Sequence, residues 1–407
     1  MPRALHIRKL GLVEYEDGLA MQKALAAARG AGLVTDTLLL LEHPRVITLG
    51  RGAKAANVLW NAQQLDARGF SLVETDRGGD VTYHGPGQLV GYPILDLKPD
   101  RRDVRRYVNS VEELMIRTAR DFGVIAERVP GRPGIWVNRA EASSAEPSTP
   151  RAQSGVRDAW EKLGAIGVHL SRWITTHGFA FNVTTDLADF RAIVPCGIQD
   201  AGVCSLQSLR ASPLQARSGA ITQEPLARER DALAISFADV EERAALHGAE
   251  VWESEPFEIP VELEAISLTI VREGLHGDEL LLLHRVPARG GFWQTLTGKR
   301  ERGEAALAAA ARELFEETGF APALEELREL DYVHAFALDP SLAPDAARVP
   351  IFCRETAFAV RVHPSAEPRL DPREHDAHRW VSLEDALPLL PFAGLRRAAR
   401  LALQQLA

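Results

Sequence analysis

Residues 77–88 of this 407-residue chain read RGGDVTYHGPGQ, with four glycines and a proline around the β-prone piece Val81–Tyr83. Glycine allows positive φ angles and lets a backbone approach a bound molecule closely, so the stretch can border a ligand site. It can equally be a strand between two turns, with His84 as a turn residue, because glycine-rich loops are common. The sequence of the neighbouring segments is therefore needed to distinguish the two interpretations.

Short strands and amphipathic helices surround this stretch. The apolar run Leu38–Leu41 ends at Glu-His-Pro, which predicts a buried strand. In the first half we also expect helices over 17–29 and 104–122, and strands over 134–137, 165–170 and 179–183. Two polar segments are predicted to be loops without a core, at residues 141–157 and 212–230. We further expect a helix over 232–247 and an acidic linker over 253–260 that leads into a second α/β unit. In that unit we expect paired strands over 266–271 and 280–284 and a helix over 305–318.

Cys196 lies between a proline and a glycine, which would hold its side chain on a rigid and open turn. Only the thiolate is a nucleophile, so a catalytic cysteine needs a nearby cation that lowers its pKa from about 8.5. Lys162, at the start of the apolar segment 163–170, is the candidate cation. The plain alternatives are a buried cysteine that acts as a small hydrophobic residue and a solvated surface lysine.

Taken together, residues 1 to about 245 resemble the octanoyltransferase family of lipoate biosynthesis. The matching blocks follow the family's order: LEHP (41–44), TLGR (48–51), RGGDVTYHGPGQ (77–88), GIWV (134–137), KLGAIGV (162–168), THGFAFNV (176–183) and PCG (195–197). The resemblance implies an α/β (α+β) fold akin to biotin and lipoate ligases, a mixed sheet with flanking helices. It also implies that Cys196 attacks the thioester of octanoyl-acyl-carrier protein and holds the octanoyl group, while Lys162 accepts the thiol proton. The acceptor would be a lysine of the lipoyl domains of 2-oxoacid dehydrogenases and of the glycine cleavage H protein.

The same resemblance implies an apolar acyl pocket. Its implied lining is Arg77, Gly78, Gly79, Asp80, Val81, Thr82, Tyr83, His84, Ala165, Ile166, Gly167, Gly178, Phe179 and Ala180. Small and apolar side chains can wall a tunnel for such an acyl chain without polar groups. His84 and His169 are further candidates for proton handling, with a structural role as the alternative. The rival for this half is an ATP-dependent lipoate or biotin ligase on the same fold, which forms an adenylate and needs no thiolate.

A second motif occupies residues 298–320. The pattern G-x5-E-x7-R-E-U-x-E-E-x-G-U is matched at every fixed position, by Gly298, Glu304, Arg312, Glu313, Leu314, Glu316, Glu317, Gly319 and Phe320. Glu313, Glu316 and Glu317 fall at i, i+3 and i+4 of the expected helix and hence on one face. Carboxylates so close repel one another unless a hard cation lies between them, and Mg²⁺ binds both carboxylates and phosphates. The plain alternative is a solvated, salt-bridged helix.

This pattern is the Nudix box, and residues from about 260 to 407 resemble a complete Nudix hydrolase domain, an α/β/α sandwich. The resemblance implies Mg²⁺ ligands at Glu313, Glu316 and Glu317, a pairing role for Arg312, and structural support from Gly298 and Glu304. The substrate would be a nucleoside diphosphate linked to another moiety. The flanking sequence is most similar to the dATP and dihydroneopterin triphosphate pyrophosphatase branch. A module that senses a nucleotide without cleaving it is the alternative, and Glu355 is either an additional metal ligand or base or a surface residue of an edge strand.

Composition and charge limit the remaining function classes. Hydrophobic residues make up 46% of the chain and charged residues 25%, which is typical of globular proteins. The formal net charge of −9 disfavours a nucleic-acid polymer or an anionic membrane as the main partner. No run approaches the ~18 apolar residues of a transmembrane helix. Three cysteines form no disulfide framework, so we expect a cytoplasmic protein. The expected map is a transferase domain over 1–248, a linker over 249–259 and a Nudix domain over 260–407.

Overall fold

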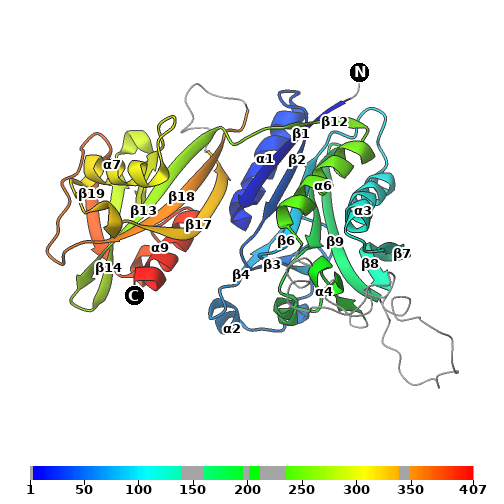
Figure 1. The fold of residues 1–407 in the computed structure, drawn as a ribbon, viewed down its shortest axis with the longest axis horizontal. Helices are drawn as coiled ribbons and strands as arrows, with labels where there is room; N and C mark the ends of the chain where they lie inside the picture. The colour runs from blue at the N-terminus through cyan, green and yellow to red at the C-terminus, as the bar shows by residue number, and fades with distance from the viewer. Residues whose placement is uncertain (1–2, 139–159, 196–200, 211–234, 339–348, 407) are drawn as a thin grey trace, which may run out of the picture. The chain divides into compact units, whose positions relative to one another are not determined.

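The chain forms two compact units. The structure, a computed structural model, describes residues 3–138, 160–195, 201–210, 235–338 and 349–406 (Figure 1). Unit 1 comprises residues 1–9 and 22–259, and unit 2 comprises residues 10–21 and 260–407. The two segments expected to be loops, 141–157 and 212–230, lie outside the described residues.

The main sheet of unit 1 is mixed. In the described part of the chain its strands follow the order β12 (Ser254–Glu258), β1 (Arg3–Leu12), β2 (Asp36–Glu42), β6 (Gln88–Ile94), β10 (Ile174–Asn182), β9 (Trp160–Ser171), β8 (Arg132–Asn138) and β7 (Glu127–Val129), and β11 (Gly202–Val203) pairs with β9. The β1–β12 and β9–β11 pairs are parallel, whereas the pairs from β2 to β7 are antiparallel. The mixed sheet expected for a ligase-like fold is therefore confirmed.

Helices flank this sheet (Figure 1). The helix expected over 104–122 is α3 (Val104–Asp121), which begins at Asp103, whose side chain accepts a hydrogen bond from the Arg106 N–H. A similar cap at Ser236 begins α6 (Phe237–Val251). The apolar faces of α3 and α6 share one core with alternate side chains of the sheet, including Leu38, Leu40, Phe179 and Phe181. The helix expected over 17–29 is α1 (Tyr15–Gly30).

A smaller sheet carries the glycine-rich stretch. It has the order β4 (Ser71–Glu74), β3 (Val46–Leu49) and β5 (Val81–His84). Val81 and Tyr83 point into a second core, which they share with Ile47, Phe70 and Phe190. The expected strand is therefore confirmed, and after the turn at 85–87 the chain enters β6 of the main sheet at Gln88. The described part of the unit also contains two short helices, α2 (Ala62–Asp66) and α4 (Leu206–Arg210).

The segment expected to be a linker contains regular structure instead. Helix α6 continues to Val251, and residues 254–258 form β12, which pairs in parallel with β1 from Arg3↔Ser254 to Ile7↔Glu258. Proline and acidic residues are compatible with this strand because it lies at the edge of the sheet, where one side of the backbone needs no partner and charged side chains face solvent. The acidic composition thus marks an edge strand of unit 1 rather than a free connector.

Unit 2 is an α/β/α sandwich, as expected. Its sheet has the order β15 (Trp293–Gln294), β14 (Gly277–Arg285), β13 (Leu263–Gly274), β18 (Phe352–Arg361) and β17 (Arg328–Ala337), with β16 (Leu296–Lys299) paired to β13 and β19 (His375–Val381) paired to β14. Helix α7 (Ala306–Thr318) packs on one face through Ala309, Ala310 and Leu314. Helix α9 (Ala393–Leu406) packs on the other through Leu395 and Ala399, and α8 (Leu383–Ala386) lies beside it.

The paired strands expected at the start of unit 2 are confirmed, because β13 and β14 pair antiparallel. Val271 pairs with Leu280, and Gly274 pairs with Gly277 across the turn. None of the helices in the described residues has the length and apolar character needed to cross a membrane.

Candidate functional site

Two of the segments predicted to line an acyl pocket lie directly opposite each other in unit 1. On the antiparallel strands β9 and β10, Ala165 pairs with Ala180 and Gly167 pairs with Gly178. Because side chains alternate along a strand, Ala165 and Ala180 share one face of the sheet, and Phe179 points to the other, where it joins the core under α3 and α6. The two alanines leave space on the face that carries the pocket.

Glycine is required where the backbones approach one another. A Cβ atom added at Gly178 would lie 2.2 Å from the Gly91 carbonyl oxygen, and one added at Gly167 would lie 3.1 Å from the Gly78 carbonyl oxygen. The Gly78 N–H donates to the Val168 carbonyl at 3.0 Å, which fastens the glycine-rich loop to β9. The glycines therefore bring the loop, β9 and β10 together.

Arg77 and Asp80 hold the loop itself. The buried Arg77 guanidinium donates to the Thr48 carbonyl at 2.7 Å, to the Thr48 hydroxyl at 2.9 Å and to the Gly78 carbonyl at 3.0 Å. The Asp80 carboxylate accepts from the backbone N–H groups of Lys54 and Val81. In this structure both charged side chains therefore organise the loop.

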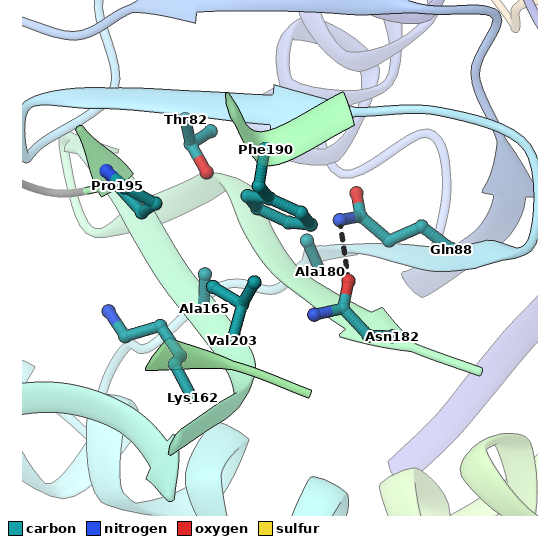
Figure 2. A pocket seen from close by; sticks show the side chains of 9 residues that line it. All are labelled: Thr82, Gln88, Lys162, Ala165, Ala180, Asn182, Phe190, Pro195 and Val203. Carbon is teal, nitrogen blue, oxygen red and sulfur yellow. Dashed lines mark hydrogen bonds between the residues drawn. The ribbon is translucent and has the colours of Figure 1, made fainter. Parts of the chain in front are cut away.

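A pocket opens beside these strands (Figure 2). It is lined by Thr82, Gln88, Lys162, Ala165, Ala180, Asn182, Phe190, Pro195 and Val203. Lys162 is only 7% exposed, and its Nζ lies 4.7 Å from the centre of the Trp136 ring, so the alternative of a solvated surface lysine is wrong. Pro195 borders the same pocket and immediately precedes Cys196 in the sequence.

The structure divides the sequence-predicted lining into three groups. Thr82, Ala165 and Ala180 of the predicted lining are at this pocket, together with Lys162, which was predicted as a catalytic residue. Val81, Tyr83 and Phe179 point into the two cores, as strand alternation requires. The remaining residues of the prediction lie on the loop and on the paired strands. The prediction did not include Gln88, Asn182, Phe190, Pro195 and Val203. Asn182 could have been found from its spacing, because it lies two residues after Ala180 on the same strand.

Buried polar side chains form a chain of hydrogen bonds behind the pocket. His84 Nδ1 lies 2.7 Å from Gln88 Oε1, and Gln88 Nε2 donates to Asn182 Oδ1 at 3.0 Å. Asn182 Nδ2 in turn donates to the Cys204 carbonyl at 3.0 Å. Burial, with the neighbouring His43 as the second cause, holds the pKa of His84 well below its usual range. His84 is therefore neutral at physiological pH.

The second candidate histidine of the prediction lies at the edge of this region. His169 Nε2 is 3.8 Å from Asp76, whose carboxylate lies 2.8 Å from His177 Nε2. His177 is buried, and this burial lowers its pKa. These contacts link the residue before Arg77 to β9, which carries His169, and to β10, which carries His177.

Two of the three cysteines lie in the part of the chain that the structure describes. Cys196 lies outside the described residues. Cys204 is fully buried, and its Sγ is 3.8 Å from the Glu161 carbonyl oxygen. Cys353 belongs to unit 2, and burial raises the pKa of its thiol to about 12. Both Cys204 and Cys353 are buried, so neither offers the accessible thiol that a nucleophile needs.

Arg312 organises the Nudix helix of unit 2. Its guanidinium binds Glu304 through two hydrogen bonds of 2.9 Å, Glu313 at 2.7 Å, Glu316 at 3.2 Å and the Lys299 carbonyl at 3.0 Å. The hydrogen bonds from Arg312 lower the pKa of the Glu304 carboxyl to about 2. Burial raises the pKa of Glu313, and the charges of Glu317 and Glu316 add to this effect. The carboxylates are thus close enough to repel one another, as the sequence spacing predicted.

Glu317 has a different partner. Its Oε2 lies 2.9 Å from His375 Nε2 on β19, and both side chains are buried. Gly298 also contributes, because a Cβ atom there would lie 2.2 Å from the carboxyl carbon of Glu313. In the described part of the chain no three His, Cys, Asp or Glu side chains converge on one point. The helix carboxylates are instead turned toward Arg312 and His375.

Glu355 is not a surface residue of an edge strand. Strand β18 lies between β13 and β17, and Glu355 is 4% exposed. Its side chain shares the α9 face with Ala357 and Ala359, whereas Phe358 faces α7. Glu355 therefore lies on the opposite face of the sheet from the Nudix helix, and the sheet separates it from Glu313, Glu316 and Glu317. Its proposed role as an additional ligand or base is excluded by this placement.

Comparison with known proteins gives two family matches along the chain. Residues 14–218 match the lipoyl protein ligase A/B catalytic domain, and residues 264–402 match the NUDIX domain. An octanoyltransferase of Myxococcus xanthus is 45% identical over 394 residues, which are 97% of this chain and 98% of that protein. An octanoyltransferase of Acidobacterium capsulatum is 50% identical over 210 residues, covering 50% of this chain and 79% of that protein. The crystal structure of lipoate-protein ligase A bound with ATP is 17% identical with a TM-score of 0.42, and covers 64% of this chain and 90% of that one.

Proposed function

Because the chain belongs to the octanoyltransferase family and carries a Nudix hydrolase domain, we propose that unit 1 transfers an octanoyl group from octanoyl-acyl-carrier protein to a lysine of a lipoyl domain. The proposed acceptors are the lipoyl domains of 2-oxoacid dehydrogenases and the glycine cleavage H protein. The proposed compartment is the cytoplasm, where a thiol nucleophile stays reduced.

The observation that carries this proposal is the buried Lys162 in a pocket that Pro195 also borders. Lys162 comes from β9 and Pro195 from the segment that leads directly to Cys196. A lysine kept out of water beside an apolar pocket is suited to exchange a proton with a thiol. The other two thiols are buried, so Cys196 remains as the proposed nucleophile.

The proposed reaction has two transfers. Lys162 takes the proton of the Cys196 thiol, and the thiolate attacks the thioester carbonyl. The carbon–sulfur bond to the carrier breaks, and the carrier sulfur takes the proton back from Lys162. The amine of the acceptor lysine then attacks the enzyme thioester, forms an amide and releases the Cys196 sulfur, which is protonated again. The alanines of β9 and β10 give the acyl chain apolar walls.

Mass spectrometry tests the enzyme thioester. After incubation with octanoyl-acyl-carrier protein, the wild-type chain should gain one octanoyl group, and Cys196→Ser should gain none because a serine hydroxyl is not ionised by one lysine. An adduct that persists in Cys196→Ser contradicts the assignment. Transfer to a lipoyl domain should also proceed without ATP, and strict ATP dependence would identify a ligase instead.

For unit 2 we propose a Mg²⁺-dependent pyrophosphohydrolase that cleaves a nucleoside diphosphate derivative. The donor set fits this ion, because the carboxylates of Glu313, Glu316 and Glu317 follow one another on a single helix face and repel one another. These three residues would hold Mg²⁺, which when bound polarises a phosphoryl oxygen. Arg312 keeps Glu313 and Glu316 in position, and Glu304 anchors Arg312.

A nucleotide panel tests this second activity. Phosphate or pyrophosphate release should depend on added Mg²⁺ and should stop with chelation by EDTA. Nucleotide binding without release would instead favour the sensing module. Octanoyl transfer measured in the same samples should be unaffected by EDTA, which separates the two activities.

A further inference from the structure

We propose that Asn182 donates the hydrogen bond that stabilises the negatively charged carbonyl oxygen during acyl transfer in the Lys162 pocket. This inference rests on the proposed octanoyl transfer and assigns it one further catalytic residue. Asn182 is the last residue of β10 and is 4% exposed. Its side chain lines the pocket together with Lys162 and Thr82, and Ala165 and Val203 lie between it and Lys162 in Figure 2.

Hydrogen-bond counting determines which way the Asn182 amide faces. The Cys204 carbonyl can only accept, so the group that lies 3.0 Å from it must be the nitrogen Nδ2. Oδ1 then faces Gln88 and accepts from Nε2 at 3.0 Å. The Gln88 amide is oriented in the same way, because its nitrogen also lies 3.2 Å from the Tyr83 carbonyl. Backbone carbonyls at two points therefore set the direction of both amides.

His84 closes this chain at its far end. Both N–H groups of Gln88 are used, so Gln88 Oε1 must accept from His84 Nδ1 at 2.7 Å. Nδ1 therefore carries the proton of the neutral ring, and the ring supports the Gln88 orientation as a donor. Burial keeps the pKa of His84 well below its usual range, so this arrangement does not change near neutral pH. The Asn182 amide is thus preorganised by three buried groups.

One N–H of Asn182 remains available for a ligand. The amide nitrogen has two hydrogens, and the Cys204 carbonyl takes one of them. Among the described residues no other protein group accepts from Nδ2. The pocket therefore offers an amide N–H and the side-chain nitrogen of Lys162, within walls formed by Ala165, Ala180, Phe190 and Val203. Such a site favours an oxygen that gains negative charge over a neutral one.

The chemistry of the transfer needs such a donor. When the thiolate sulfur bonds to the thioester carbon, the π electron pair of the carbonyl moves onto oxygen. When the intermediate collapses, that pair returns, the bond to the carrier sulfur breaks, and the carrier sulfur takes the proton held by Lys162. Lys162 gains and loses a proton in this cycle and cannot be a constant donor. The Asn182 amide neither gains nor loses one, so it can stabilise the oxygen throughout.

Two ligands distinguish stabilisation of the charged oxygen by Asn182 from a role in which Asn182 only contributes to the shape of the pocket. Octanal adds to a cysteine thiolate and creates a tetrahedral oxygen, whereas octanamide resembles the unreacted substrate. In Asn182→Ala and Asn182→Asp, octanal affinity and the rate of acyl-enzyme formation should fall by roughly 10²–10³-fold, as for loss of one oxyanion donor. Octanamide affinity should stay within about twofold of wild type, because the donor acts on developed charge. The control Asn109→Ala, at an exposed position of α3, should change neither.

A second variant keeps Asn182 itself. Gln88→Glu has nearly the same shape but cannot donate to Asn182 Oδ1, and its carboxylate attracts the second Asn182 N–H away from the pocket, so the same selective loss of octanal affinity is expected. Equal weakening of octanal and octanamide in both variants, or no change in octanal affinity, overturns the role of Asn182. Failure of the wild-type chain to form either an octanal or an octanoyl adduct would instead reject the proposed transfer.

Discussion

The Nζ of Lys162, which lines the pocket, lies 4.7 Å from the centre of the Trp136 ring, and both side chains are buried. The aromatic face orients the Lys162 nitrogen and attracts it once it has taken up a proton. Lys162→Met keeps most of the side-chain volume but removes the proton acceptor. We expect it to slow acyl-enzyme formation on the order of 10²–10⁴-fold, the usual contribution of a general base. Stopped-flow or quenched mass spectrometry of the first transfer measures this rate.

Trp136→Phe is the matched variant for this contact. It retains an aromatic face of weaker attraction, so acyl-enzyme formation should fall by no more than about tenfold. If Lys162→Met transferred octanoate as fast as wild type, the lysine would be structural. If Trp136→Phe had the larger effect, the ring rather than the amine would determine the rate.

Gly178→Ala should destabilise unit 1 strongly. Its new Cβ would lie 2.2 Å from the Gly91 carbonyl oxygen on the neighbouring strand, and a backbone atom cannot turn away. Overpacking of this kind costs roughly 3 kcal/mol of unfolding free energy, at the upper end of its usual range. Gly202→Ala is the control, because its new Cβ would first meet the flexible Glu161 side chain at 3.2 Å. Calorimetry of both variants should show a lowered transition only for Gly178→Ala.

Local patterns were sufficient to predict most of the secondary structure. The apolar period predicted α3, and two neighbouring apolar runs predicted the pairing of β13 with β14, because these features depend on near neighbours. The role of residues 254–258 was mispredicted because their pairing with β1 joins segments about 250 residues apart. Acidic residues and prolines look alike in a linker and in an edge strand.

The pocket was harder to predict than the motifs that surround it. The resemblance identified contiguous blocks, whereas strand alternation sends Val81 and Phe179 into cores and leaves Thr82 and Ala180 at the pocket. Phe190 and Val203 reach the pocket from segments outside those blocks. The burial of Glu355 in unit 2 could not be predicted from its local sequence either, because it depends on which strands flank β18.

Glu355→Gln should make unit 2 more stable than wild type, by a difference in unfolding free energy that grows as pH rises. Burial raises the pKa of Glu355 from its unfolded value of 4.5 to about 7. Between these pH values the unfolded chain has lost the proton and the folded chain retains it, so rising pH lowers the wild-type free energy of unfolding. Glu355→Gln has no titrating group at this position, so its free energy of unfolding does not fall for this reason. Its advantage should grow from near zero at pH 4.5 to about 3 kcal/mol at pH 7 and above.

Calorimetric scans of the full chain across this pH range test the slope. The neighbouring His334, whose pKa burial lowers to about 4, stays largely neutral above that pH in both proteins and drops out of the difference. A constant difference between wild type and Glu355→Gln at all pH values would show that Glu355 titrates normally.

Glu317→Gln should remove most pyrophosphohydrolase activity and leave octanoyl transfer unchanged. The substitution is nearly isosteric and retains an oxygen that can face His375 Nε2, so the packing of α7 should survive. It removes one negative charge from the helix face that would hold Mg²⁺, and such electrostatic stabilisation of a transition state contributes on the order of 10²–10³ in rate. The control Glu325→Gln removes the same charge from an exposed position of unit 2 and should not change the activity.

Glu304→Gln should lose less activity than Glu317→Gln, because Glu304 acts through Arg312. Pyrophosphate release at fixed Mg²⁺ measures activity, and calorimetric titration measures Mg²⁺ affinity. The Mg²⁺ affinity should fall in Glu317→Gln, should fall less in Glu304→Gln, and should not change in Glu325→Gln. Unchanged Mg²⁺ affinity in Glu317→Gln would remove this residue from the ligand set, and turnover that does not depend on Mg²⁺ would leave unit 2 with the Nudix fold but without the proposed chemistry.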